Sequence, residues 1–400
     1  MSKWRLGAVG GAYAVLFGNF LLSLFIAATQ IMPASVLTPI MADLTVSPSA
    51  AGLLVSLALL SPALLALPVG YALDRVDNRG VLLLGTVIVV GTNLWAWDAA
   101  LAGAFVPLLG ARFLTGVGII MTWTAGANMV TAAFDGRNAA TATGVFTASA
   151  PLGYVVGQAL PPVVAGWWGW EANFPVFAIA SAVSFAVFAV TAFRTASRAE
   201  TDRRANFADF RRVLSSRAVW FVAAMSFVAY SLNLFFNSWM PTYLTERLGY
   251  SVAESGLLVA LFPAMGVIAR PSGGIVSDRV LGGRRRPVPL LSFLVTVPLV
   301  VVLWAIDAPL VVVAILVLGG FSVQLGIGIY YTYIRELVED RVAGSAIAVL
   351  SMASFAGGFV APVFAGWLIE TTGAYLTAFL FAIALAVAGV GLAWGSPESS

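Results

Sequence analysis

The chain is 400 residues long, and 60% of its residues are hydrophobic while only 10% are charged. A soluble protein of this length needs more charge to stay dissolved, so the composition excludes an ordinary soluble domain and indicates a protein surrounded by the lipid bilayer. The chain has no Cys and no His, which excludes disulfides, thiol chemistry, histidine-ligated metals and a histidine proton relay. We expect neither a metal nor a cofactor.

Apolar runs of about 20 residues or more recur along almost the whole chain, and each is long enough to span ~30 Å of hydrocarbon. Backbone polar groups find no water in lipid, so these runs must form helices or a closed barrel. The runs are continuous rather than alternating, which excludes the barrel. The sequence therefore predicts an all-α membrane protein with twelve transmembrane helices, near 11–41, 49–73, 80–98, 102–132, 138–162, 172–193, 218–244, 252–277, 287–306, 308–334, 342–368 and 373–395.

The basic residues are distributed unevenly between the two sides of these spans. If the N-terminus is cytoplasmic, every Lys and Arg falls on the cytoplasmic side except Arg112 and Arg270, which lie inside spans, and Arg247. Positive charge collects on the cytoplasmic side of membrane proteins, so we expect a multi-pass protein of the cell membrane with both termini cytoplasmic. The net charge of +3 then reports topology, and no nucleic-acid partner is expected.

The first span carries Asn19, Ser23 and Gln30 at helical spacing on one face. Such polar residues either form hydrogen bonds between helices or line a cavity, and both interpretations are open for each residue. We count Asn19 and Gln30 as candidate substrate-binding residues.

The motif G-x-x-x-D-R follows the second span at residues 70–75 and returns 204 residues later, after the eighth span, at residues 274–279. Arg137 and Arg341 are also 204 residues apart, which indicates a duplicated unit of half the chain. The sequence therefore predicts two pseudo-symmetric six-helix bundles, residues 1–193 and 218–400. The candidate gating residues are Gly70, Asp74, Arg75, Arg79 and Arg137 in the first half, and Gly274, Asp278, Arg279 and Arg341 in the second.

The fourth span contains Arg112, followed by Gly116 and Gly118. A charged arginine in lipid is expensive, so we expect Arg112 to face protein or water and to act in conformational change or coupling, together with the two glycines. In the fifth span Tyr154 and Gln158 are candidate substrate-binding residues, and Pro151 should bend or loosen the helix.

Residues 194–217 are poor in apolar residues and rich in arginine, so we interpret them as a cytoplasmic linker between the halves. In the second half, polar and charged residues recur on single helix faces within spans seven, eight and ten. These are the remaining candidate substrate-binding residues: Tyr230, Asn233, Asn237, Arg270, Gln324 and Tyr331.

Twelve spans, two halves, a central linker and G-x-x-x-D-R after spans two and eight resemble the major facilitator superfamily across essentially the whole chain. Arg112-x-x-x-Gly116-x-Gly118 looks like that family's fourth-helix motif. Ala150-Pro151 stands where the family's antiporter motif has Gly-Pro, and the closing Gly-Gly of that motif is missing. The resemblance implies alternating access around a central site. It also implies that the pairs Asp74–Arg137 and Asp278–Arg341 close the cytoplasmic side.

Within that family, WMPTYL (239–244) followed by ARPSGGIVSDRVLGGRRR (269–286) is similar to anion-handling branches, namely nitrate/nitrite, cyanate-type and organic-anion porters. Arg270 stands where nitrate porters have an arginine that contacts the anion, but Ala66 replaces the second arginine of those proteins. The glycine-rich nitrate signatures of the fifth and eleventh helices are not clearly present.

We therefore predict a secondary active or facilitative transporter, acting as a monomer, whose solute is a small organic or inorganic anion. An exporter of drugs or other hydrophobic compounds, and a transporter-like receptor without flux, are the alternatives. A membrane enzyme is not expected, because clustered catalytic carboxylates, His and Cys are all missing. No Asp or Glu lies deep in a predicted span, so symport, antiport and uniport all remain open.

Overall fold

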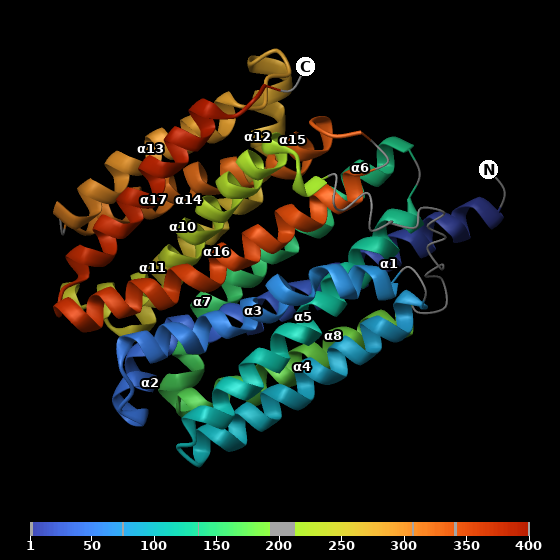
Figure 1. Ribbon diagram of the computed structural model, residues 1–400. Coiled ribbons are helices and arrows are strands. Elements are labelled where there is room, and N and C mark those ends of the chain that lie inside the picture. The colour runs from blue at the N-terminus through green and yellow to red at the C-terminus, as the bar shows by residue number, and fades with distance from the viewer. Residues whose placement is uncertain are drawn as a thin grey trace.

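The computed structural model describes residues 3–73, 76–134, 136–192, 213–305, 308–339 and 342–398, and every regular element within these ranges is a helix (Figure 1). The first half forms α1 (Lys3–Ile31), η1 (Met32–Val36), α2 (Leu37–Leu44), α3 (Pro48–Leu73), α4 (Asn78–Leu101), α5 (Phe105–Ala133), α6 (Gly136–Thr147), α7 (Ser149–Trp168), η2 (Trp170–Ala172) and α8 (Asn173–Thr191). The second half forms α10 (Arg217–Leu248), α11 (Val252–Ala264), α12 (Gly266–Ile275), η3 (Val276–Val280), α13 (Pro287–Ala305), α14 (Pro309–Ile327), α15 (Tyr330–Glu336), α16 (Ala343–Thr372) and α17 (Tyr375–Gly395). The predicted fold class, an all-α membrane protein, is confirmed.

Eleven segments of the described chain are helical, long and apolar enough to cross a membrane, and they coincide with eleven of the twelve predicted spans. The span predicted near 138–162 forms two helices instead, α6 and α7, which meet at Ala148. Pro151 accounts for a weak point here, because it has no backbone N–H to donate to the carbonyl of Thr147. The sequence predicted a bend at this proline, and the structure instead interrupts the helix at Ala148, three residues before it.

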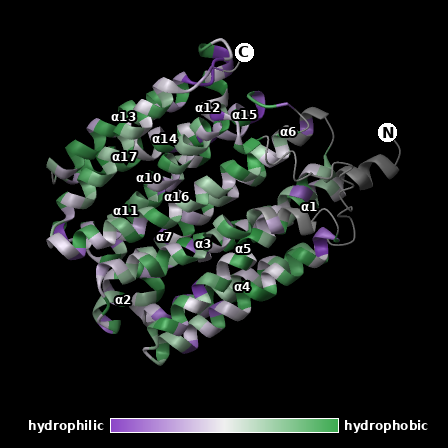
Figure 2. Cartoon of the chain, viewed as in Figure 1, coloured by the Kyte–Doolittle hydropathy of each residue, from purple (hydrophilic) through white to green (hydrophobic). Residues whose placement is uncertain are grey.

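Large apolar side chains remain exposed on the outer surface of the helices. Val190, Leu310 and Val106 are 87%, 80% and 77% exposed. Such exposure would favour aggregation in water, whereas lipid tails are a suitable neighbour for these side chains. Hydrophobic colouring runs along the helices in Figure 2, and hydrophilic colouring gathers toward their ends.

The helices pack in two groups that follow the chain order (Figure 1). In the first group α1 lies against α7 and α8, and α4 lies against α5; in the second, α10 lies against α16 and α17, and α13 against α14 and α17. The groups meet where α3 runs along α16 and α7 along α11. The boundaries at residues 193 and 218 and the linker 194–217 stay predictions, because 193–212 lie outside the described ranges.

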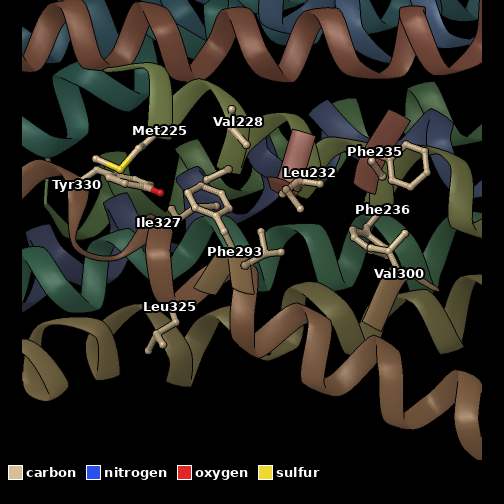
Figure 3. Close-up of a cluster of buried hydrophobic side chains, with 14 of the residues drawn as sticks. Met225, Val228, Leu232, Phe235, Phe236, Phe293, Val300, Leu325, Ile327 and Tyr330 are labelled. Carbon is tan, nitrogen blue, oxygen red and sulfur yellow. The ribbon is translucent and has the colours of Figure 1, made fainter. Parts of the chain in front are cut away.

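A large apolar cluster fills the interior of the second group. Phe236 stacks on Phe262 there, with 4.8 Å between the ring centroids. Close packing of this kind holds membrane helices together, because lipid removes most of the hydrophobic driving force between them. Figure 3 shows part of the cluster, including Met225, Val228, Leu232, Phe235, Phe236, Phe293, Val300, Leu325, Ile327 and Tyr330.

The two groups are in contact at the end of the molecule where α3 begins, and we call this end the closed end. A Cβ atom on Gly52 of α3 would overlap the carbonyl oxygen of Pro362 of α16, so only a glycine allows this approach. The carboxylate of Glu370 accepts a hydrogen bond from the backbone N–H of Ser49 at 3.2 Å and another from its hydroxyl. Glu370 therefore supplies, from α16, an acceptor for the first turn of α3.

Arg112 joins three helices of the first group and is completely buried. Its guanidinium donates to the carbonyls of Thr29 at 3.0 Å, Gln30 at 2.5 Å and Leu54 at 3.3 Å. Thr29 has no helical donor four residues on, because Pro33 lacks a backbone N–H, and α1 changes to a 3-10 turn at this point. Arg112 thus satisfies a carbonyl that the proline leaves free, and it fixes the kink of the first span.

Replacing Gly52 with Val should weaken the closed end, because the side chain cannot fit against the Pro362 carbonyl. A cysteine at Val55, which is 1% exposed, should react faster with a membrane-impermeant thiol reagent when Gly52→Val is also present. Gly91→Val is the matched control, since nothing lies within 4 Å of a Cβ at that helical glycine. Equal reactivity in the two double variants would contradict the proposed closure.

Replacing Arg112 with Met should lower the thermal unfolding midpoint of the purified protein, because it leaves buried carbonyls on two other helices without a donor. Each unsatisfied buried group costs about 1–3 kcal/mol. Arg284→Met, at an exposed arginine, controls for the change of side chain and should leave the midpoint nearly unchanged. A midpoint for Arg112→Met equal to that of the control would show that the clamp is dispensable.

Candidate functional site

Five polar side chains from four helices form one continuous hydrogen-bonded chain. On α10, the Asn237 side chain donates to the carbonyl of Asn233 at 2.8 Å. Gln158 of α7 donates to the carbonyl oxygen of Asn237 at 2.6 Å. Gln324 of α14 donates to Asn233 Oδ1 at 3.2 Å, and Arg270 Nε of α12 donates to Gln324 Oε1 at 2.9 Å. This chain crosses from the first helix group into the second.

Gln158 supplies a hydrogen-bond donor that the backbone of α10 lacks. Pro241 is four residues after Asn237 and has no N–H, so the Asn237 carbonyl lacks its helical donor. The Gln158 amide supplies that donor from the opposite group. The Gln158 Oε1 atom is buried and has no hydrogen-bond partner among the described residues, so the site keeps an acceptor available.

Glycines bring the helices of this site into contact. A Cβ on Gly266 would lie 2.9 Å from both Gln324 Cδ and Pro151 Cβ, and one on Gly328 would overlap the carbonyl of Arg270. These close approaches place α12 directly against α14 and α7. They allow Arg270 and Gln324 to face each other at hydrogen-bonding distance.

Arg270 is half-buried and only its Nε is engaged. Its two terminal nitrogens have no hydrogen-bond or ion-pair partner in the part of the chain that the structure describes. An arginine within a membrane span costs from about 2.5 to more than 10 kcal/mol unless it is paired or hydrated. The free edge of this guanidinium is therefore the strongest anion-attracting feature of the site.

The three predicted tyrosines come from three different helices: Tyr154 from α7, Tyr230 from α10 and Tyr331 from α15. Tyr154 belongs to the apolar cluster against which Tyr230 packs. Tyr331 also lies 3.4 Å, hydroxyl to hydroxyl, from Ser351 of α16. Within the described residues, the hydroxyls of Tyr154 and Tyr230 make no hydrogen bond.

Gln30 and Asn19 behave differently from each other. The Gln30 side-chain amide has no partner among the described residues, and its neighbour Ile31 packs in the same apolar cluster as Tyr154. Asn19 instead lies inside the first group, where its Nδ2 donates to Val15 at 2.9 Å and its Oδ1 faces α5. The structure joins five of the predicted binding residues by hydrogen bonds and leaves Asn19 away from them; the five are Gln158, Asn233, Asn237, Arg270 and Gln324.

Gly116, Gly118 and Pro151 lie at helix crossings. A Cβ on Gly116 or Gly118 would lie 2.6 Å from a backbone carbonyl of α3 or α4, respectively. Pro151 contacts Gly266 of α12 and is buried. Together with the clamp at Arg112, these contacts place the four residues in helix packing rather than on the hydrogen-bonded chain.

At the end opposite the closed end, which we call the motif end, charged residues join elements of the second group. Arg285 binds Glu336 through two bonds of 2.8 and 2.6 Å and also pairs with Asp278. The hydrogen bonds from Arg285 to Glu336, and then to Asp278, raise the pKa of Arg285. The sequence shows Arg285 within a run of three arginines, but no spacing rule pointed to Glu336 as its partner.

The other predicted gating residues are only partly described. Arg79 pairs with Asp77 at 2.7 Å at the start of α4, Arg279 is exposed, and nothing lies within 4 Å of a Cβ at Gly274. The predicted pairs Asp74–Arg137 and Asp278–Arg341 are not described and stay predictions. Asp74, Arg75 and Arg341 lie outside the described residues, and of Gly70 and Arg137 only the helical backbone is described.

Three curated relatives resemble this chain over most of their length. It is 28% identical over 370 residues to the hexuronate transporter of Bacillus subtilis (strain 168), covering 86% of this chain and 85% of that protein. It is 22% identical over 357 residues to the nitrite extrusion protein of the same organism, covering 88% and 86%. It is also 24% identical over 364 residues to a probable nitrate transporter of Staphylococcus haemolyticus (strain JCSC1435), covering 89% and 90%.

The fold is that of a solved transporter structure. A bacterial homolog of the human lysosomal transporter Spinster, in an inward-facing and unoccupied conformation, matches with a TM-score of 0.74. The match covers 98% of this chain and 96% of that one at 19% identity. The relatives are transporters, which confirms the prediction of a transporter rather than an enzyme. The family model described as Major Facilitator Superfamily matches residues 15–362, and this chain belongs to that superfamily.

Proposed function

We propose that the protein carries a small organic anion across the membrane by alternating access, with Arg270 as the contact for the anionic group. The observation that carries this proposal is the free edge of the Arg270 guanidinium within a membrane span. A planar guanidinium with two unengaged nitrogens fits a carboxylate or an oxyanion through paired hydrogen bonds. An anionic solute would also neutralise a charge that otherwise has no acidic partner among the described residues.

The polar groups around Arg270 favour a hydroxylated carboxylate over nitrate. The hydroxyls of Tyr154 and Tyr230 and the amide of Gln30 can donate or accept, and Gln158 Oε1 can accept from a solute hydroxyl. Nitrate offers only acceptors and would leave that buried oxygen unpaired. Two relatives are named for sugar acids, as hexuronate and probable galactarate/D-glucarate transporters. Nitrate and nitrite, named for other relatives, are the second candidates.

The hydrogen-bonded chain is also an argument against an exporter of hydrophobic compounds. A pocket selected for apolar solutes gains little from five linked polar side chains, and burying them against an apolar solute would leave them partly unsatisfied. A receptor without flux remains distinguishable by experiment, because it would bind the anion in proteoliposomes and transport none.

For the transport cycle, we propose that the two helix groups are six-helix bundles that rock about the Arg270 site. The contact at Gly52 and Glu370 would close one end, and charged residues at the motif end would close the other. The pairs Asp74–Arg137 and Asp278–Arg341 would supply that second closure. We place the motif end in the cytoplasm of a cell-membrane protein that acts as a monomer.

Arg270→Ala should abolish uptake of the transported anion into proteoliposomes, and Arg270→Lys should weaken binding because ammonium lacks the planar fork. The first measurement is a thermal-shift screen of D-glucuronate, D-glucarate, nitrate and nitrite. A ligand at 100 times its Kd should stabilise the folded protein by about 2.7 kcal/mol. Arg284→Ala is the matched control, since this arginine is exposed. Wild-type uptake by Arg270→Ala would make the arginine structural and favour the exporter interpretation.

The proposed orientation makes a separate prediction. Because the chain contains no Cys, single cysteines report position without background. A cysteine at Asp98, at the closed-end side of α4, should react with an impermeant reagent on intact cells. A cysteine at Gly283, at the motif end, should react only after the membrane is opened. The reverse pattern would invert the assignment.

A further inference from the structure

We propose a second anion-binding site at the motif end, built on Arg335, which attracts anionic solutes to this end of the molecule before they reach Arg270 or after they leave it. This inference rests on the proposed function. It adds a residue that the polar chain around Arg270 does not include.

The site is a cavity of about 570 Å³ that is open to the surface, and its described lining residues are Tyr331, Thr332, Arg335, Glu336, Val338 and Ile347. Residues three and four apart share one helix face, so Thr332 and Tyr331 flank Arg335 on the same side of α15. The cavity therefore presents a hydroxyl, a phenol and a guanidinium together. These are donors suited to an oxyanion or a carboxylate.

Arg335 differs from Arg285 because its guanidinium has no acidic partner among the described residues. The acidic lining residue, Glu336, has its two carboxylate oxygens bonded by Arg285 at 2.6 and 2.8 Å. No ion pair or hydrogen bond in the described part of the chain involves the Arg335 guanidinium. Because Arg285 binds both oxygens of Glu336, that carboxylate does not pair with Arg335. The Arg335 guanidinium can therefore attract a mobile anion.

Tyr331 connects this cavity with the inner site. It lines the cavity, and it lies three residues after Gly328, the residue against which the Arg270 backbone carbonyl packs. Arg335 lies one helical turn, about 6 Å along the axis, beyond Tyr331. An anion leaving Arg270 toward the motif end therefore meets the Tyr331 hydroxyl and then a second cation. A cation that has no fixed partner attracts counter-ions in this way and raises their local concentration.

The test uses a single cysteine at Ile347, which lines the cavity from α16 in a chain that has no other cysteine. The reaction rates of an anionic reagent, methanethiosulfonate ethylsulfonate, and a cationic one, methanethiosulfonate ethyltrimethylammonium, are compared at low salt. Arg335→Gln should lower the anionic-to-cationic rate ratio by about threefold or more, and 1 M salt should remove the difference. Arg335→Lys should keep most of the ratio, because it retains the charge.

Arg284→Gln is the control, since it removes an exposed arginine that does not line the cavity. An unchanged ratio in Arg335→Gln would overturn the proposal. An equal fall in Arg284→Gln would also overturn it, because the effect would then belong to the whole basic end. The ratio requires no transport, so Arg270→Ala should leave it intact while uptake is lost. The two proposals can therefore fail independently.

Discussion

Two carbonyls deprived of their helical donors by proline organise much of this molecule. In lipid no water replaces a missing donor, so each freed carbonyl needs a side chain from elsewhere. Pro33 frees the carbonyl of Thr29, and Arg112 binds it from α5. Pro241 frees the carbonyl of Asn237, and Gln158 binds it from α7. The first interaction holds one helix group together, and the second joins that group to the other.

The two arginines inside membrane spans show how the same side chain serves different ends. Arg112 is fully buried, and all three of its donor nitrogens bind backbone carbonyls, so its bonding capacity is used within the fold. Arg270 spends one nitrogen on Gln324 and keeps two available. The difference follows from the neighbouring acceptors. Arg112 lies opposite backbone carbonyls next to Pro33, whereas Arg270 lies opposite the single side-chain oxygen of Gln324.

Much of this arrangement could be predicted from the sequence, because hydropathy defines the spans and helical spacing selects faces. Asn233 and Asn237 are one turn apart, so their common face follows directly. Partners between helices could not be predicted, since they depend on crossings that local sequence does not encode. Asn19 shares a polar face with Gln30, yet at Asn19 that face of α1 meets Gly126, near the C-terminal end of α5. Glu336, the last residue of α15, was missed for the same reason, because its partner Arg285 comes from the segment between η3 and α13.

The hydrogen bond from Gln158 to Asn237 has a consequence for conformational change in the absence of a solute. If the two groups separate at this level, the Asn237 carbonyl loses its donor in a region with little water, and the empty protein becomes less stable. A solute hydroxyl that takes over the bond would remove that penalty, so occupancy itself would lower the barrier to reorientation. Such a bond would make idle cycling slow without any bound ion, and it would link the rate of turnover to the hydrogen-bonding groups of the cargo.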